Sequence, residues 1–366
     1  MMKYRVMPCG GQELSEIGMG MAKLHLGDPK EWPLILEKGF ENGINFYDLC
    51  GGSMDVFRCF GEVLGAKRSE IYTQMHFGAV YDENGVYGRI YKLDKVKDSL
   101  ERMMAAAKTD YTDFGMLHCI DEEDAYEHLE QSGILDYAQS LKQQGVVKYL
   151  GISTHTPAMA RKLMDSGIID MMMFSINPAY DYAIGKWAGG SYNERMDLYT
   201  AAEQQGIGIT VMKIFSGGLL LDTETSPINV TLSPHQCMRY ALDRPGVVSI
   251  LPGVTSLAEL DILLDYYNAE EEDTRYTALK NAAPKEAQGR CVYCSHCAPC
   301  PKGIDIALVN KYYDLAKGGD PLAADHYMTL KIKAGACVEC GKCRRRCPFG
   351  VDQPQRMMEI RKYFGK

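Results

Sequence analysis

Two short groups of cysteines constrain what this chain can fold into more than any other feature of its sequence. Each group has three cysteines spaced three residues apart and a fourth that is followed by proline. The first group is Cys291, Cys294, Cys297 and Cys300, and the second is Cys337, Cys340, Cys343 and Cys347. Three thiolates at this spacing converge on one cuboidal cluster, whereas the fourth lies too far along the chain and ligates a second cluster. The groups therefore predict two [4Fe–4S] clusters.

The two clusters are expected to share their ligands across the groups. Cys347 completes the site of the first triplet, and Cys300 completes the site of the second. Zinc is the alternative, because paired CxxC motifs also suit a tetrahedral zinc ion. Triplets with a trailing Cys-Pro favour iron–sulfur clusters, since zinc sites usually draw four ligands from two CxxC pairs.

The 36 residues between Cys300 and Cys337 contain two segments, 306–316 and 323–332, that are predicted to be helices. This part of the chain therefore resembles the all-helical type of ferredoxin. A basic run lies within the second group of a chain whose formal net charge is −8: Lys342, Arg344, Arg345 and Arg346. Compensation of the cluster's negative charge is one interpretation, and docking of an acidic electron-transfer partner is the other.

The remaining sequence gives no sign of export or of a membrane. The other five cysteines are scattered, and we interpret them as buried small hydrophobes: Cys9, Cys50, Cys59, Cys119 and Cys237. Neither a signal peptide nor a run of about 18 apolar residues is recognisable. The negative net charge disfavours a nucleic-acid partner, because phosphate binding needs a basic surface. We therefore expect a cytoplasmic protein that binds neither membranes nor nucleic acid.

From about residue 17 to 270 short apolar runs alternate with longer amphipathic stretches, which is the pattern of repeated βα units. The eight runs predicted as strands are 18–23, 44–49, 70–76, 114–119, 147–154, 170–177, 207–214 and 247–254. Eight parallel units predict a (β/α)₈ TIM barrel, an α/β fold. Residues 4–16 are predicted to form a hairpin that closes the bottom of this barrel. We place the barrel at 1–285 and the all-helical, ferredoxin-like domain at 286–366.

Three polar residues stand where predicted strands end, and barrels of this kind carry their chemistry at the carboxyl ends of the strands. Asp48 ends the second strand, Gln74 nearly ends the third, and His118 nearly ends the fourth. Each residue alone is equally consistent with a hydrogen-bonded group of the core. Together they predict a site at the barrel mouth.

These positions, with segments 44–48, 116–118, 147–153 and 251–253, resemble the aldo/keto reductase family over residues 1 to about 280. With the cysteine groups, the chain resembles the ferredoxin-fused branch of that family found in anaerobic bacteria. The resemblance implies a tetrad of Asp, Tyr, Lys and His that reduces carbonyls with NADPH. Asp48 and His118 fill two positions, but Ser53 stands at that of the tyrosine and Gln74 at that of the lysine. Asp48 or His118 is then the expected general acid, and the predicted catalytic residues are Asp48, His118 and Gln74.

The resemblance also indicates residues that would line a phosphate-bearing cofactor, either NADP(H) or a flavin. They are Ser153, Lys213, Gly217, Gly218 and Gly253. Glycines at strand ends are, however, more often turn residues. Val254 and Leu263 stand near the places where the family commonly offers a cation and an asparagine to NADPH.

Three functional hypotheses result. The first is an iron–sulfur oxidoreductase whose two clusters exchange electrons with a small organic substrate at the barrel mouth. The second is an NADPH-dependent carbonyl reductase with a displaced proton donor, namely Tyr47, Tyr81 or Tyr180. The third is a non-catalytic electron-transfer or binding protein. Several aromatic residues indicate either an aromatic or otherwise flat ligand or the packing of their own loops: Tyr81, Tyr87, Tyr180, Tyr182 and Trp187.

Overall fold

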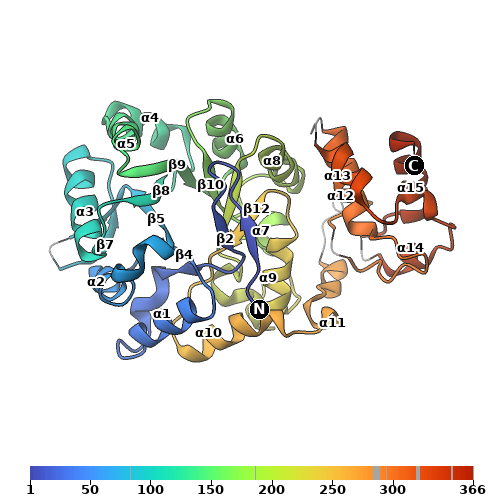
Figure 1. Cartoon of the computed structure of the whole chain (residues 1–366), viewed down its shortest axis with the longest axis horizontal. Coiled ribbons are helices and arrows are strands. Elements are labelled where there is room, and N and C mark those ends of the chain that lie inside the picture. Colours follow the sequence, from blue (N-terminus) through green and yellow to red (C-terminus); the bar gives the residue numbers. More distant parts are fainter. Residues whose placement is uncertain are drawn as a thin grey trace. The chain divides into compact units, whose positions relative to one another are not determined.

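Eight parallel strands form the central sheet of the computed structural model, in the order β12-β11-β10-β9-β8-β5-β4-β3 (Figure 1). The strands are β3 (Met19–Gly20), β4 (Phe46–Leu49), β5 (Tyr72–Phe77), β8 (Thr112–Leu117), β9 (Val147–Thr154), β10 (Met171–Ser175), β11 (Gly208–Met212) and β12 (Val247–Ile250). Two parallel bridges, Ile17 to Ile250 and Gly20 to Gly253, join the first strand to the last. The predicted (β/α)₈ barrel is thereby confirmed.

The structure describes residues 1–82, 84–185, 187–282, 289–293, 295–318, 322–347 and 349–365. The chain divides into two compact units. The first comprises Met1–Ile176, Ile207–Ile214 and Val247–Ala269, and the second comprises Asn177–Gly206, Phe215–Gly246 and Glu270–Lys366. The domain boundary predicted near residue 285 falls within 283–288, outside the described residues.

The helices of the first unit lie outside the strands, as Figure 1 shows. They are α1 (Trp32–Glu41), α2 (Met54–Val63), α3 (Leu93–Ala106), α4 (Glu123–Gln131), α5 (Ile134–Gln143), α6 (Pro157–Asp165) and α10 (Leu257–Leu264), with the 3₁₀ turns η1 (Met21–Leu26), η2 (Gly65–Glu70) and η4 (Asp265–Tyr267). Each α-helix buries one apolar stripe, as expected for a helix packed on a sheet. Ser53, at the position of the family's tyrosine, is the N-cap of α2, where its hydroxyl accepts from Asp55 N–H at 3.2 Å.

Two antiparallel hairpins accompany the barrel. The first pairs β1 (Tyr4–Val6) with β2 (Glu13–Ser15), as the sequence predicts. Its residues Met7 and Leu14 are fully buried against Phe46 and Phe114, which lie near the amino ends of their strands. This hairpin therefore closes the bottom of the barrel. The second hairpin, β6 (Ala79–Tyr81) with β7 (Tyr87–Arg89), connects β5 to α3.

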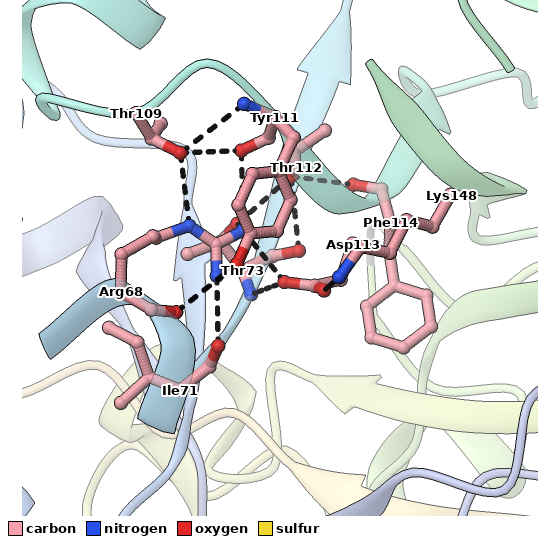
Figure 2. Close-up of polar contacts among 9 residues, drawn as sticks. All are labelled: Arg68, Ile71, Thr73, Thr109, Tyr111, Thr112, Asp113, Phe114 and Lys148. Atoms are coloured by element: carbon pink, nitrogen blue, oxygen red, sulfur yellow. Dashed lines mark hydrogen bonds and ion pairs between the residues drawn. The ribbon is translucent and has the colours of Figure 1, made fainter. Parts of the chain in front are cut away.

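A buried polar cluster lies at the amino ends of β5 and β8 (Figure 2). Asp113 accepts from Arg68 Nη2 at 2.7 Å, from Thr73 N–H at 2.9 Å and from Lys148 Nζ at 2.9 Å. Arg68 also donates to the Ile71 carbonyl at 2.8 Å. This face of a (β/α)₈ barrel serves stability rather than chemistry, so we assign the cluster a structural role.

The second unit is helical in the part of the chain that the structure describes. Its elements are α7 (Pro178–Asp181), α8 (Tyr192–Gln204), η3 (Ser216–Leu221), α9 (Pro234–Leu242), α11 (Glu271–Thr274), η5 (Thr277–Asn281), α12 (Ile306–Lys317), α13 (Ala323–Thr329), η7 (Ala334–Ala336), α14 (Lys342–Arg346) and α15 (Gln353–Phe364). Asp181 accepts from Arg195 Nε at 2.8 Å and from the hydroxyls of Tyr199 and Tyr240 at 2.6 and 2.8 Å. All four residues are about fully buried, so this network joins α7, α8 and α9.

The cysteine-rich segment contains the two predicted helices, observed as α12 and α13. The repeated Cys-Pro-x-Gly-x-Asp sequence places an equivalent aspartate before α12 and before α15. Asp305 caps α12 by accepting from Leu308 N–H, and Asp352 caps α15 by accepting from Gln355 N–H. The two halves also meet through a buried hydrogen bond of 2.9 Å from Asn310 Nδ2 to Gln353 Oε1. The internal repeat of the sequence is thus a repeat of local structure.

Hydrogen bonds attach this segment to the other helices of the second unit. Arg244, which follows α9 and is 1% exposed, donates to the Val292 carbonyl at 2.6 Å. Arg290 Nη2 lies 2.7 Å from Asp197 Oδ1 of α8. Among the described residues, none of the helices combines the length and the apolar character needed to cross a bilayer.

Candidate functional site

Strands β4 and β5 and the residue after β8 bring four polar side chains together in the barrel interior. Gln74, expected near the end of its strand, is the third of the six residues of β5. Asp48 and Gln74 are direct neighbours in the register of β4 and β5. Side chains two positions apart share one face of a strand, so His76 lies on the same face as Gln74. His118 directly follows β8. All four residues are at most 4% exposed.

Asp48 is the acceptor at the centre of this group. Its Oδ1 lies 2.8 Å from His76 Nε2 and accepts from Gln74 Nε2 at 3.0 Å. Gln74 Oε1 in turn accepts from Thr210 Oγ1 at 3.3 Å, which fixes the orientation of the amide. The predicted residues Asp48 and Gln74 therefore meet, and the closest polar partner of Asp48 is an imidazole rather than an amide.

The two histidines extend the contacts toward the hairpin β6–β7. His76 Nδ1 lies 2.9 Å from His118 Nδ1, and His118 Nε2 lies 2.6 Å from the Tyr87 hydroxyl. Burial, with the neighbouring His76 adding to it, lowers the pKa of His118 well below its ordinary value. His118 is therefore a neutral imidazole near neutral pH, with one nitrogen donating and the other accepting.

The hydrogen bonds from Tyr87 to Asp48 run in one direction when Asp48 is a carboxylate and both imidazoles are neutral. A carboxylate only accepts, so His76 Nε2 carries a proton and His76 Nδ1 is an acceptor. His118 Nδ1 must then donate to His76, which leaves His118 Nε2 to accept from the Tyr87 hydroxyl. The proton chain therefore consists of Tyr87, His118, His76 and Asp48. Protonation of Asp48 reverses every donor and acceptor along it.

Exposure distinguishes the two ends of the proton chain. Tyr87 is 39% exposed, whereas the other three residues are 2–4% exposed. A substrate at the barrel mouth would thus meet Tyr87 rather than Asp48. Burial raises the pKa of the Tyr87 hydroxyl, so Tyr87 keeps its proton near neutral pH.

His76 and Tyr87 were not among the catalytic residues predicted from the sequence. His76 could have been found from the two-residue period of β5, because it shares its strand face with Gln74. Tyr87 lies on a short hairpin and reaches His118 across 31 positions of sequence, and no local pattern indicates that contact.

Two of the three tyrosines proposed as displaced donors have other partners for their hydroxyl groups. Tyr47 alternates with Asp48 along β4, and its hydroxyl donates to the Ile44 carbonyl at 3.1 Å. Its ring packs edge-on against Phe60 of α2, away from the barrel interior. Tyr81 donates to the Gly51 carbonyl at 2.7 Å. Tyr180 belongs to the second unit.

Two cysteines lie beside the histidines. Cys50 Sγ and one ring nitrogen from each of His76 and His118 all lie within 4.8 Å of one another. Cys119 Sγ lies 3.5 Å from His118 Nε2. Burial raises the pKa of the Cys50 thiol well above its ordinary value, and the Asp48 charge adds to this effect. Burial likewise raises the pKa of Cys119.

A second polar group surrounds Lys213, which follows β11. Lys213 Nζ lies 2.9 Å from His155 Nε2, and His155 Nδ1 lies 3.0 Å from Asp121 Oδ2. Burial lowers the pKa of Lys213. Burial alone would raise the pKa of Asp121, but hydrogen bonds and charge from His155 lower it. Ser153, at 1% exposed, lies near the carboxyl end of β9, so these residues gather at the same end of the barrel strands.

The three predicted glycines have different surroundings. Gly253 forms the bridge to Gly20 that closes the barrel, and a Cβ on it would touch the Lys23 side chain at 3.4 Å. Gly217 and Gly218 lie in η3 of the second unit with φ angles of 76° and 104°. Such left-handed backbone favours glycine, which gives both a local structural reason to be there.

The described cysteines of the two groups line two cavities in the second unit. Cys300 lies with Cys337, Cys340 and Cys343 around one cavity. Cys291 and Cys297 lie with Cys347 around the other. Cys294 is outside the described residues. Each cavity thus combines the described triplet cysteines of one group with the trailing cysteine of the other.

Apolar side chains and sulfur hydrogen bonds complete these cavities. Ile304, Ile306 and Met357 line the first, and Val292 and Phe349 line the second. The Glu339 N–H donates to Cys337 Sγ at 3.4 Å, and Gln353 Nε2 donates to Cys291 Sγ at 3.8 Å.

The basic run has at least one structural contact. Arg346 Nη1 donates to the Pro299 carbonyl at 2.8 Å, which links the second cysteine group to the first. Arg344 pairs with Asp352 at 3.1 Å. The acidic electron-transfer partner stays a prediction.

Comparison with known proteins supports the relationship inferred for the barrel. A family model described as the aldo/keto reductase family matches residues 16–236. An uncharacterized oxidoreductase, YqkF of Bacillus subtilis, is 23% identical over 289 residues, which cover 71% of this chain and 89% of that protein.

Solved structures of similar fold include the aldo-keto reductase AKR11C1 from Bacillus halodurans in its holo form. It has a TM-score of 0.60 and 18% identity, and the match covers 77% of this chain and 97% of that one. PA4992, a putative aldo-keto reductase from Pseudomonas aeruginosa, has a TM-score of 0.54 and 20% identity over 72% of this chain and 92% of its own. At such identities these structures support the fold alone.

Proposed function

Because the chain belongs to the aldo/keto reductase family, we propose that it is an iron–sulfur oxidoreductase of this type. Two [4Fe–4S] clusters would be coupled to the redox conversion of a small organic substrate at the barrel mouth. The observation that carries this proposal is the pair of cavities that each combine cysteines of both groups. A crossed pair of sites of this kind is typical of proteins with two [4Fe–4S] clusters.

The donor sets fit such clusters. Cys337, Cys340, Cys343 and Cys300 supply four thiols to one cavity, which is the number that a [4Fe–4S] cluster requires. The other site would be held by Cys291, Cys297 and Cys347 together with Cys294. The clusters, when bound, would supply one-electron transfer. The donated hydrogen bonds at Cys337 and Cys291 would stabilise the negative charge on the sulfurs.

The barrel residues would handle the protons that accompany the redox reaction. Oxidation of a substrate hydroxyl to a carbonyl releases two electrons, one for each cluster, and two protons, of which the one on carbon would pass to solvent. The hydroxyl proton would pass to Tyr87 as the Tyr87 proton moves to His118 Nε2. The His118 Nδ1 proton then moves to His76 Nδ1, and the His76 Nε2 proton moves to Asp48. Reduction of a carbonyl uses the same moves in reverse and starts from protonated Asp48. Proton transfer by a positioned side chain of this kind contributes about 10²–10⁴-fold to a rate.

A nicotinamide or flavin cofactor is a further part of the proposal. Lys213, held by His155 and Asp121, would supply a cation to an anionic group of the cofactor. Ser153 would contribute a hydroxyl nearby. Gly253 belongs to the same unit as Lys213 and Ser153, whereas the roles of Gly217 and Gly218, which belong to the second unit, stay a prediction.

The experiment is anaerobic purification of the full chain followed by iron, sulfide, flavin and nicotinamide analysis. About eight iron and eight sulfide per chain are expected from two closed four-cysteine sites. The dithionite-reduced protein is then mixed with aromatic carbonyl compounds and enones, and re-oxidation is followed by visible absorbance. Zinc at the cysteines without acid-labile sulfide would overturn the cluster proposal.

One observation favours a second candidate function, an NADPH-dependent carbonyl reductase. The Tyr87 hydroxyl, 2.6 Å from His118, is a tyrosine donor displaced from the family's position at Ser53. Consumption of NADPH with simple aldehydes tests this candidate. We expect it to be very slow, because burial raises the pKa of the Tyr87 hydroxyl and the nearby charge of Arg89 offsets this rise only in part.

A further inference from the structure

We propose that Cys50, His76 and His118 bind one Zn²⁺ ion at the barrel mouth. The Cys50 sulfur and one nitrogen from each imidazole lie within 4.8 Å of one another. A tetrahedral zinc ion with bonds of about 2.0–2.3 Å separates its ligand atoms by roughly 3.3–3.7 Å. Small movements of the three side chains would bring their ligand atoms from within 4.8 Å to that separation.

The outer contacts of both histidines suit this role. Histidines that bind metals usually place their second nitrogen against a carboxylate or another polar group, which fixes the ring. His76 Nε2 lies against Asp48, and His118 Nε2 lies against the Tyr87 hydroxyl. The Nδ1 atoms of the two rings lie 2.9 Å apart, and they are the nitrogens left for a metal if each Nε2 keeps its present contact.

The donor set selects the class of metal. One thiolate and two imidazoles suit zinc, whereas magnesium and calcium prefer oxygen ligands. Three protein ligands leave the fourth position of a tetrahedron for water or substrate, which is the arrangement of catalytic rather than structural zinc sites. Cys50 would give up its thiol proton to solvent. The proton on His118 Nδ1 would move to Nε2 and be donated to the Tyr87 hydroxyl.

Zinc and the proton chain exclude each other. The proton chain needs a proton between the Nδ1 atoms of His76 and His118, and zinc would occupy that position. Zinc-loaded protein should therefore be unable to pass a proton from Tyr87 to Asp48. The binding site itself rests on the contacts of the three ligands, and only this consequence for turnover rests on the proposed function.

The test uses the full chain with its clusters loaded anaerobically. Protein is equilibrated with zinc chloride, separated from unbound metal by gel filtration, and analysed for zinc, iron and sulfide. Wild type should retain about one zinc per chain with unchanged iron and sulfide. Absorption at the zinc edge should show one sulfur at about 2.3 Å and nitrogens at about 2.0 Å.

Variants locate the site. Cys50→Ser should weaken zinc binding at least tenfold in competition with a chromophoric chelator. Cys119→Ser is the matched control, since Cys119 also lies beside His118 but is not one of the three grouped ligands, and it should leave the affinity unchanged. His76→Gln provides a second ligand variant if Cys50→Ser does not fold.

Three results would overturn the proposal: equal zinc affinity in Cys50→Ser and wild type, a zinc site of sulfur ligands only, and zinc uptake matched by loss of iron. The last two would place the zinc at the cluster cysteines. Iron and sulfide counts alone decide the cluster proposal, so the failure of one proposal is distinguishable from the failure of the other.

Discussion

Replacing Asp113 with alanine tests how strongly the polar cluster at the bottom of the barrel stabilises the fold (Figure 2). Asp113 is 1% exposed and accepts from Arg68, from the Thr73 N–H and from Lys148. Arg68 is 7% exposed, so the substitution leaves a buried guanidinium without its carboxylate. The Lys148 side chain is 45% exposed and can turn toward solvent.

The expected loss can be worked out from these contacts. Removing one member of a buried ion pair costs about 3–5 kcal/mol, because the remaining charge stays desolvated. Arg68 keeps hydrogen bonds to the Ile71 carbonyl and the Thr109 hydroxyl, so we expect about 3 kcal/mol for this part. The Thr73 N–H also loses its acceptor, which adds about 1 kcal/mol. The free energy of unfolding should therefore fall by about 4 kcal/mol.

Urea denaturation followed by far-UV circular dichroism measures this loss of free energy. The two units need not unfold together, so the transition of the first unit, which contains Asp113, is analysed separately. Asp170→Ala is the matched control. Asp170 pairs with Lys142 and accepts from the Leu150 N–H at 2.8 Å, but its side chain is 26% exposed. Its loss should be about 1–2 kcal/mol.

Equal losses for Asp113→Ala and Asp170→Ala would refute the reasoning, because burial would then make no difference. The double variant Arg68→Met with Asp113→Leu replaces the pair by apolar groups, which is often neutral for stability. It should recover most of the loss. If it is as unstable as Asp113→Ala, the desolvated guanidinium is not the cause.

The remaining predictions concern the two candidate sites. Cys347→Ser should perturb the spectrum of the cluster assigned to the first cysteine triplet more than that of the second, and a change confined to the second would disprove the crossed ligation. Tyr87→Phe should lower the turnover rate about 100-fold, measured with a substrate that re-oxidises the reduced protein. Tyr81→Phe is the control and should have a small effect. Equal losses of turnover in the two variants would argue against the proton chain. Asp121→Asn should be less stable than wild type above the ordinary carboxyl pKa. The pKa of Asp121 is lowered in the folded state, so this difference in stability should disappear as pH falls through that lowered pKa. Acid denaturation measures it, and a difference in stability that stays constant with pH would contradict the prediction.

The barrel was predictable from sequence because strand burial leaves a strong pattern. The run 147–154 is observed unchanged as β9 (Val147–Thr154), and its residues from Leu150 onward are buried. The run 18–23 is only partly a strand, since the chain turns into η1 after Gly20. Apolar periodicity cannot distinguish a short strand from a buried 3₁₀ turn, because both bury consecutive apolar residues.

The candidate site was less predictable because it depends on contacts between distant segments. Asp48, Gln74 and His118 could be chosen from their places at strand ends. Cys50 was interpreted as a buried small hydrophobe, and only the folded chain shows two imidazoles beside it. The grouping of α7, α8 and α9 with the cysteine-rich segment likewise comes from tertiary contacts, such as that of Arg244 with Val292, that leave no sequence signal.

Tyr87 reaches the proton chain from the hairpin β6–β7, whereas the other three members come from barrel strands or the residue after one. The hairpin pairs with itself through Ala79 and Arg89, so its tip can be exchanged without breaking the hydrogen bonds of the central sheet. The proton donor on this hairpin can therefore be changed independently of the barrel strands that hold its hydrogen-bond partners. In directed evolution, libraries restricted to this hairpin would change the identity, reach and acidity of the donor while the histidines and Asp48 stay in place. The barrel strands would thus hold the proton acceptors in place, while the hairpin would determine which side chain donates the proton.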